Sequence, residues 1–212
     1  MVDNLDSIAD RTRQSFSAID AARERALPLS RDAIRHCSGT IRAVHRQEFQ
    51  VADELLKSAR SLLHDIEQAV AEHHELSYTG FVRDAQKEFA EGSLTLALIT
   101  GKPLPDPGEL GVGAAAYLNG LGEAVGELRR YLLDSMRRGD LSRGNELLAV
   151  MDDIYGVLVT IDFPDAITGG LRRTTDMVRG VLERTRSDLT LAISQKGLEE
   201  KLGRFDRNLK EG

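Results

Sequence analysis

Apolar residues recur every three or four positions along almost the whole chain, which is the period of an amphipathic helix. The pattern is clearest over 30–73, at Ile34, Ile41, Val44, Val51, Leu55, Leu56, Leu62, Leu63 and Ile66. No segment alternates apolar and polar residues between turn signals, as a half-buried strand would. The sequence therefore predicts an all-α protein.

Proline and glycine divide this pattern into helices. We expect Pro28 to end an N-terminal helix, because proline lacks the amide hydrogen that a helix interior needs. The further predicted helices cover about 30–73, 77–100, 113–138, 141–161 and 171–207. Between two of them lies a proline-rich loop, 101–111. We expect 1–212 to form a single domain, a bundle of about six to seven helices, with 1–26 as its N-terminal helix.

Two predicted helices carry paired carboxylates. Glu88 and Glu91 are three residues apart and Glu123 and Glu127 four apart, so each pair lies on one helical face. The face of the first pair also holds Asp84 and Thr95. Grouped carboxylates repel one another unless a cation joins them, and oxygen ligands suit Mg²⁺ or Mn²⁺. The alternative is a solvated face, since glutamate is a good helix former.

Small residues beside the second pair favour the metal site. Glu123 and Glu127 point away from the apolar stripe over 118–132, and their neighbours on the helix include Gly120 and Gly126. Glycine costs a helix about 1 kcal/mol relative to alanine. Two glycines here predict that another helix or a ligand approaches the backbone closely, which a merely solvated face would not require.

The charge is acidic overall but unevenly distributed. The formal net charge is −6, yet the first 46 positions contain arginine and no lysine. One helical stripe, which we call the arginine stripe, consists of Arg31, Arg35, Arg42 and Arg46, with His45 beside it. A guanidinium binds phosphate oxygens in a planar, bidentate geometry, so the stripe predicts binding to a phosphate backbone. The alternative is an ion-paired surface, neutralised by the nearby Glu24, Asp32 and Glu48.

Other sequence features exclude several classes. Cys37 is the only cysteine, which excludes an intramolecular disulfide and a cysteine-based zinc site. No run of about 18 apolar residues is present, so no membrane-spanning helix is expected. The N-terminus lacks a hydrophobic signal core, and we expect a cytoplasmic protein.

Taken in order, four segments resemble the translin and Trax family. LSRDAIRHCSGTIRAVHR is similar to the family's early helix, and KEFAEGSLTLALI to the Trax helix with its E-x-x-E pair. AYLNGLGEAVGELRRYLLDSMRRGD and MDDIYGVLVTIDFP resemble the two helices that follow. The likeness covers about 27–192 without a break in order. Some family members carry a long insertion before the helix with the GEL motif. This chain has the short segment GKPLPDPGELG there, which is typical of a compact prokaryotic or archaeal form.

The resemblance implies a translin-like fold and a function. Translin and Trax form a barrel of eight helical subunits that binds RNA inside, and Trax carries a metal-dependent endoribonuclease site of four acidic residues. These align with Glu88, Glu91, Glu123 and Glu127, where position 123 is Glu instead of the Asp of Trax. The chain is thus expected to be a Trax-like, Mg²⁺-dependent endoribonuclease and a homo-oligomer, most simply an octamer, with Mn²⁺ as the alternative ion.

Three functions remain open at this point. The first is cleavage of single-stranded or loosely structured RNA, in which a cation held by the carboxylates activates water and the arginine stripe with His45 binds phosphates. The second is an oligomer that binds single-stranded RNA or DNA without catalysis. The third is a helical scaffold whose acidic and basic faces pair between subunits. No membrane partner is expected for any of them.

Overall fold

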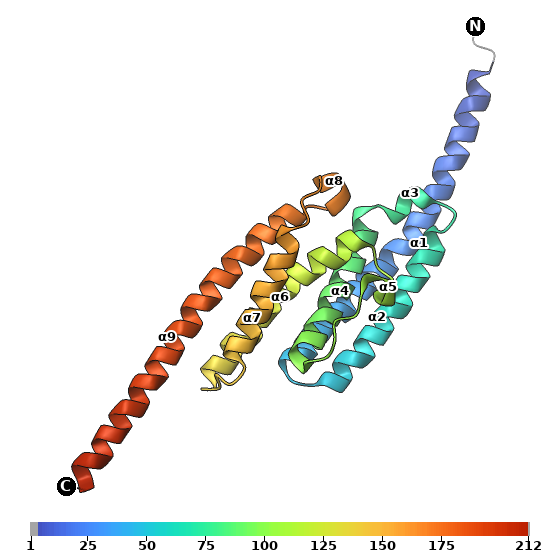
Figure 1. The fold of residues 1–212 in the computed structure, drawn as a ribbon. Helices are drawn as coiled ribbons and strands as arrows, with labels where there is room; N and C mark the ends of the chain where they lie inside the picture. The colour runs from blue at the N-terminus through green and yellow to red at the C-terminus, as the bar shows by residue number, and fades with distance from the viewer. Residues whose placement is uncertain (1–3, 212) are drawn as a thin grey trace. The chain divides into compact units, whose positions relative to one another are not determined.

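A computed structural model describes residues 4–211, and within this range it contains helices and no strand (Figure 1). The all-α prediction is confirmed. Six long helices are α1 (Leu5–His45), α2 (Phe49–Val70), α4 (Gly80–Thr100), α6 (Ala114–Arg137), α7 (Gly144–Val159) and α9 (Leu171–Glu211). Three single turns are α3 (His74–Ser77), α5 (Pro107–Leu110) and α8 (Asp165–Thr168). The chain divides into two compact units, Met1–Gly120 and Leu121–Gly212. That the two form one domain stays a prediction.

In the first unit, α1 packs along α2, and α4 packs against both (Figure 1). Small residues on α1 permit the close approach: Ala22, Ala26 and Ala33 are fully buried against Ile66 and Val70 of α2. Burying a side chain of the size of Ile66 stabilises the fold by about 1.5–3 kcal/mol. The helices of this unit are therefore held by their apolar faces.

The predicted break at Pro28 is wrong, because α1 continues through this residue to His45. The expected N-terminal helix over 1–26, whose first three positions lie outside the described residues, is thus the first part of a longer helix. Ala26 and Ser30 on either side of the proline are buried, and Leu29 packs against the core. Tertiary packing along α2 offsets the single backbone hydrogen bond that the proline removes.

The true interruption lies between α1 and α2, within the segment predicted as one helix over 30–73. Gln47 adopts a left-handed backbone with φ of 62° and reverses the chain before Phe49. Neither glycine nor proline stands here, so the sequence carried no turn signal. A non-glycine residue in this region of backbone space is uncommon, and it is accepted because the helices on both sides pack together.

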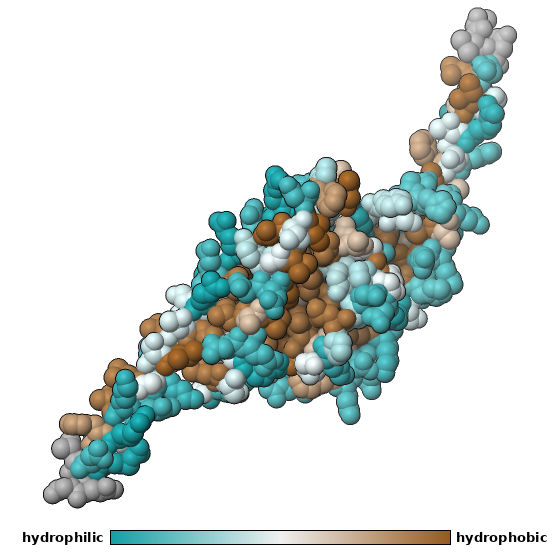
Figure 2. All heavy atoms as spheres, in the orientation of Figure 1, coloured by the Kyte–Doolittle hydropathy of each residue, from teal (hydrophilic) through white to brown (hydrophobic). Residues whose placement is uncertain are grey.

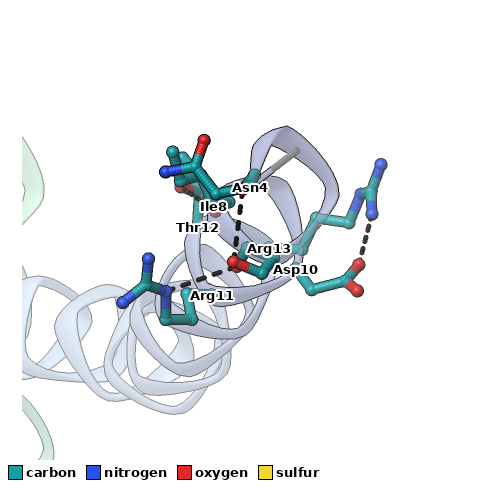
Figure 3. Close-up of polar contacts among 7 residues, drawn as sticks. Asn4, Ile8, Asp10, Arg11, Thr12 and Arg13 are labelled. Carbon is teal, nitrogen blue, oxygen red and sulfur yellow. Dashed lines mark hydrogen bonds and ion pairs between the residues drawn. The ribbon is translucent and has the colours of Figure 1, made fainter. Parts of the chain in front are cut away.

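The first part of α1 extends past the other helices of its unit (Figure 1). Its polar side chains bond within the helix itself: Asp10 pairs with Arg13 at 2.6 Å, and the Thr12 hydroxyl donates to the Ile8 carbonyl at 2.8 Å (Figure 3). Apolar side chains are nevertheless exposed here, at Leu5, Ile8 and Phe16 (Figure 2). This end of α1 has an apolar stripe that its own unit does not cover.

The proline-rich loop 101–111 brings the chain from α4 to α6. It contains one helical turn, α5, where Asp106 and Glu109 each bond the other's backbone amide in a capping box. The Tyr117 hydroxyl of α6 donates to the Pro105 carbonyl at 3.0 Å. The predicted loop is therefore short, ordered by its own caps, and fixed to the start of α6.

The second unit is built from residues 121–137 of α6 together with α7, α8 and α9. α7 packs against α9, and Arg129 of α6 donates to Thr185 and Asp188 of α9 at 3.1 and 2.7 Å. The far end of α9 again exposes apolar side chains, at Leu191, Leu198, Leu202 and Phe205 (Figure 2). Among the described residues, no helix combines the length and apolar character needed to span a bilayer.

Candidate metal centre

The carboxylate face of α4 runs from the surface into the interior. Asp84 is exposed, Glu88 and Glu91 are half-buried, and Thr95 is fully buried. Lys87 Nζ lies 3.6 Å from a Glu88 oxygen. The face predicted from spacing is therefore real, and its two glutamates lie where solvent reaches their charges only in part.

Cys37 of α1 lies close enough to these glutamates to be affected by their charge. Burial raises the pKa of the Cys37 thiol to about 12, and the charges of Glu88 and Glu91 add to the effect. The approach of α4 is close, since a Cβ on Gly92 would lie 3.6 Å from a methyl carbon of Thr40 on α1. The thiol remains protonated at neutral pH, so it is chemically inert, as expected for a small buried residue.

On another side, α6 approaches α4 through a glycine. A Cβ on Gly120 would lie 2.7 Å from the Lys87 carbonyl oxygen and 2.9 Å from the Glu91 amide nitrogen. Glu123 follows one helical turn later. The predicted close approach is thus confirmed at Gly120, whereas it is wrong at Gly126, where a Cβ would meet nothing within 4 Å.

Three carboxylates come together. Glu88, Glu91 and Glu123 each offer one oxygen, and these oxygens lie within 4.8 Å of one another. Opposite ligands of a Mg²⁺ ion, at about 2.1 Å each from the ion, are about 4.2 Å apart, so the spacing suits a small divalent cation. The buried Thr95 hydroxyl, on the same face of α4, has no hydrogen-bond partner in the described chain. The residues present fit a hard cation such as Mg²⁺ or Mn²⁺.

Glu127 stands apart from this group. It lies one turn beyond Glu123 on α6, and its carboxylate is 3.7 Å from Arg130 Nη1. Its oxygens are not within the set of three. That Glu127 is a fourth ligand stays a prediction.

The arginine stripe is exposed along α1, and both interpretations of it find support. Arg35 pairs with Asp32, and Arg46 lies 3.5 Å from Glu48, as an ion-paired surface would have it. Arg31 and Arg42 make no ion pair within 4–211. His45 is half-buried at the end of α1, beside the stripe.

The stripe does not face the carboxylates. At 100° per residue its centre lies about 150° around α1 from Cys37, the residue that lies near Glu88 and Glu91. In the first unit, the arginines and the α4 carboxylates are therefore on opposite sides of α1. The sequence could not indicate this, because it depends on which face of α1 receives α4.

Comparison with known proteins identifies the family. No protein-family model matches the chain. It is 33% identical to AfC3PO in the structure of a complex with duplex RNA, over 88% of this chain and 97% of that chain, with a TM-score of 0.80. It is 35% identical to AfC3PO in a second crystal structure, with the same coverage and TM-score. C3PO, the component 3 promoter of RISC, is of the translin family. The chain belongs to the translin family.

Two further proteins are similar to this chain. The crystal structure of apo-NeC3PO matches this translin-family chain with a TM-score of 0.75, over 91% of this chain and 98% of that chain. At 18% identity this likeness shows the fold alone. An uncharacterized protein of Methanocaldococcus jannaschii is 29% identical over 197 residues, which is 91% of this chain and 86% of the relative. The similarity to AfC3PO confirms the resemblance of the four sequence segments at the level of the family.

Proposed function

We propose that this translin-family chain is a Trax-like, metal-dependent endoribonuclease. The observation that carries the proposal is the group of three carboxylate oxygens from Glu88, Glu91 and Glu123, within 4.8 Å of one another and half-buried. RNA as the substrate is supported by AfC3PO, a relative whose structure was solved with duplex RNA. The expected partner, RNA that is single-stranded or partly duplex, is in line with the duplex RNA of that complex.

In this proposal the three carboxylates would hold one divalent cation, Mg²⁺ or Mn²⁺, whose charge would offset their mutual repulsion. When bound, the cation supplies a lowered pKa for water and neutralises charge on the phosphodiester. A carboxylate that does not hold the cation, such as Glu127 one turn further along α6, would accept the proton of the attacking water. Lys87, whose Nζ lies 3.6 Å from a Glu88 oxygen, would attract the phosphate of the RNA to the carboxylates.

The orientation of the arginine stripe makes an assembly part of the proposal. Because the stripe and the α4 carboxylates lie on opposite sides of α1, an RNA duplex that contacts both is held most simply by two copies of the chain. The exposed apolar ends of α1 and α9 supply surface for joining copies (Figure 2). We propose a closed homo-oligomer, most simply of eight, in which the carboxylates face an enclosed cavity. Sedimentation at micromolar concentration measures this directly, and a species of 23.3 kDa contradicts it.

The test of the activity uses end-labelled RNA, single-stranded and duplex, with Mg²⁺, with Mn²⁺ and with EDTA. Glu91→Gln and Glu123→Gln keep the side-chain size but remove a ligand charge, and each should lower the cleavage rate by about 100-fold or more. Asp84→Asn is the matched control, since Asp84 lies on the same face of α4 but outside the group. Cleavage that continues in EDTA, or equal rates in all three variants, contradicts the proposal.

A non-catalytic RNA-binding oligomer is the second candidate. It is favoured by the same relative, because the AfC3PO structure records a complex with RNA and not a cleavage reaction. This candidate predicts that RNA, or single-stranded DNA, is bound equally well in EDTA and in Mg²⁺ and is recovered intact. The gel of the cleavage assay separates the two candidates, since bound but uncut RNA in Mg²⁺ supports only the second.

A further inference from the structure

Thr95 is the one buried helix residue whose hydroxyl the described chain leaves without a partner. Its exposed fraction is 0%, and Oγ1 makes no hydrogen bond. The other buried hydroxyls of the long helices all have a hydrogen-bond partner, which for Ser135 is the donor Arg138 Nη2 at 3.1 Å. Ser30 donates to the Ala26 carbonyl at 3.1 Å, Thr40 to the His36 carbonyl at 3.1 Å, and Thr185 to the Val181 carbonyl at 2.7 Å. Thr95 departs from a local rule that this chain otherwise follows.

The position of Thr95 points to the acidic group. It lies four residues after Glu91, on the same face of α4. The Cα–Cβ bonds of a helix tilt toward its N-terminus, so the side chain of Thr95 leans toward the turn that carries Glu91. Along this face, exposure decreases from Asp84 to Thr95, and the hydroxyl therefore lies at the buried end of the carboxylate face.

A buried hydroxyl without a protein partner is costly, and native proteins retain one where it binds water or an ion. An apolar residue of the same shape, valine, would avoid that cost at no loss of packing. We propose that Thr95 is a positioning residue of the acidic site: its hydroxyl binds a water molecule that belongs to the shell of the cation held by Glu88, Glu91 and Glu123. The inference rests on the proposed function and adds a neutral oxygen group to its carboxylates.

The test compares three variants. Thr95→Val removes the hydroxyl at constant shape, and Thr95→Ser restores it. Thr100→Val makes the same change on the same helix, where the hydroxyl is already satisfied by the Leu96 carbonyl at 2.7 Å. Thermal unfolding is followed first in EDTA and then in a titration with Mn²⁺, so that cation affinity is measured without reference to RNA cleavage.

We expect Thr95→Val to unfold in EDTA at or above the temperature of the parent, because an unsatisfied buried group is gone. Its apparent dissociation constant for Mn²⁺ should rise by about 10-fold, the usual size of a lost outer-shell contact. Thr95→Ser should bind Mn²⁺ as the parent does, and Thr100→Val should leave the affinity unchanged.

Two results overturn the inference. One is unchanged Mn²⁺ affinity in Thr95→Val while Glu91→Gln loses it, which leaves the proposed function intact. The other is a parent that Mn²⁺ does not stabilise at all, in which case Glu91→Gln behaves as the parent and the proposed function fails as well. In the first of these results, a Thr95→Val protein that also unfolds well below the parent in EDTA assigns the hydroxyl to the fold alone.

Discussion

Gly120 provides the sharpest test of how the carboxylates are brought together. The change to alanine adds one methyl group at a point where α6 lies against the backbone of α4. That methyl carbon would be 2.7 Å from the Lys87 carbonyl oxygen, 2.9 Å from Ala90 Cβ and 2.9 Å from the Glu91 amide nitrogen. Two of these neighbours are backbone atoms of the turn that carries Glu88 and Glu91, so no side-chain rotation relieves the contact.

The magnitude follows from two opposing effects. Ordinary contact begins near 3.4 Å, so the two helices would have to separate by about 0.7 Å at this point. Overpacking of this kind costs about 1–3 kcal/mol, while the better helix propensity of alanine returns up to about 1 kcal/mol. We expect a net loss of about 1–2 kcal/mol, or a fall of the midpoint temperature by about 3–6 °C for a chain of this size.

The matched control is Gly126→Ala, on the same helix. A Cβ at Gly126 meets nothing within 4 Å, so only the propensity gain of up to about 1 kcal/mol applies there, and the midpoint should rise by about 2 °C. Both variants are unfolded in EDTA at equal chain concentration, followed by circular dichroism. The apparent Mn²⁺ affinity should fall in Gly120→Ala and stay constant in Gly126→Ala. A Gly120→Ala protein as stable as Gly126→Ala would refute the close-approach reasoning.

Two further predictions concern charge. Arg42→Ala should lower the slope of log RNA affinity against log salt by about 0.7–0.9, the value for one lost phosphate contact. Arg35→Ala should change this slope less, because Asp32 already pairs with Arg35. Equal slopes in the two variants would contradict a role for unpaired arginines. Folding raises the pKa of the Cys37 thiol from 9.0 to about 12. Between these two pH values the folded state keeps the thiol proton and the unfolded state loses it. The free energy of unfolding therefore falls as the pH rises above 9. The loss should reach about 1 kcal/mol at pH 10 and be absent from Cys37→Ala, as measured by denaturant unfolding in EDTA at pH 8 and pH 10.

How much of the fold was predictable depended on whether the deciding interactions were local. The helices that end at Thr100 and Arg137 agree with the predicted ends within a residue, because Gly101 and Gly139 follow them. Pro28 gave the wrong boundary because the local penalty was outweighed by packing along α2. Gln47 gave no signal, since its φ of 62° is imposed by the helices on both sides. Tertiary packing overrode local preference in both errors.

For the candidate site, too, the sequence predicted what depends on local spacing and not what depends on packing. Helical spacing alone placed Glu88 with Glu91, but their meeting with Glu123 depends on which helix lies against α4. The two glycines of this helix indicated a close contact, but the sequence did not distinguish between them. Gly120 makes the contact and Gly126 does not. The partnerless hydroxyl of Thr95 was beyond the reach of the sequence, because burial and a missing hydrogen bond are properties of the packed chain.

The two faces of α1 have different neighbours. A helix in a three-helix core has one face for its neighbours and one for solvent, and α1 gives Cys37 to the first and the arginine stripe to the second. No rearrangement of side chains moves a residue from one face to the other, since about 150° of helix separates them. If the stripe and the carboxylates act on the same RNA duplex, two copies of the chain hold it most simply. A chain held as a monomer should then still bind phosphate through its exposed stripe but lose cleavage, as a gel assay with end-labelled RNA would measure, even with every residue of the acidic group in place.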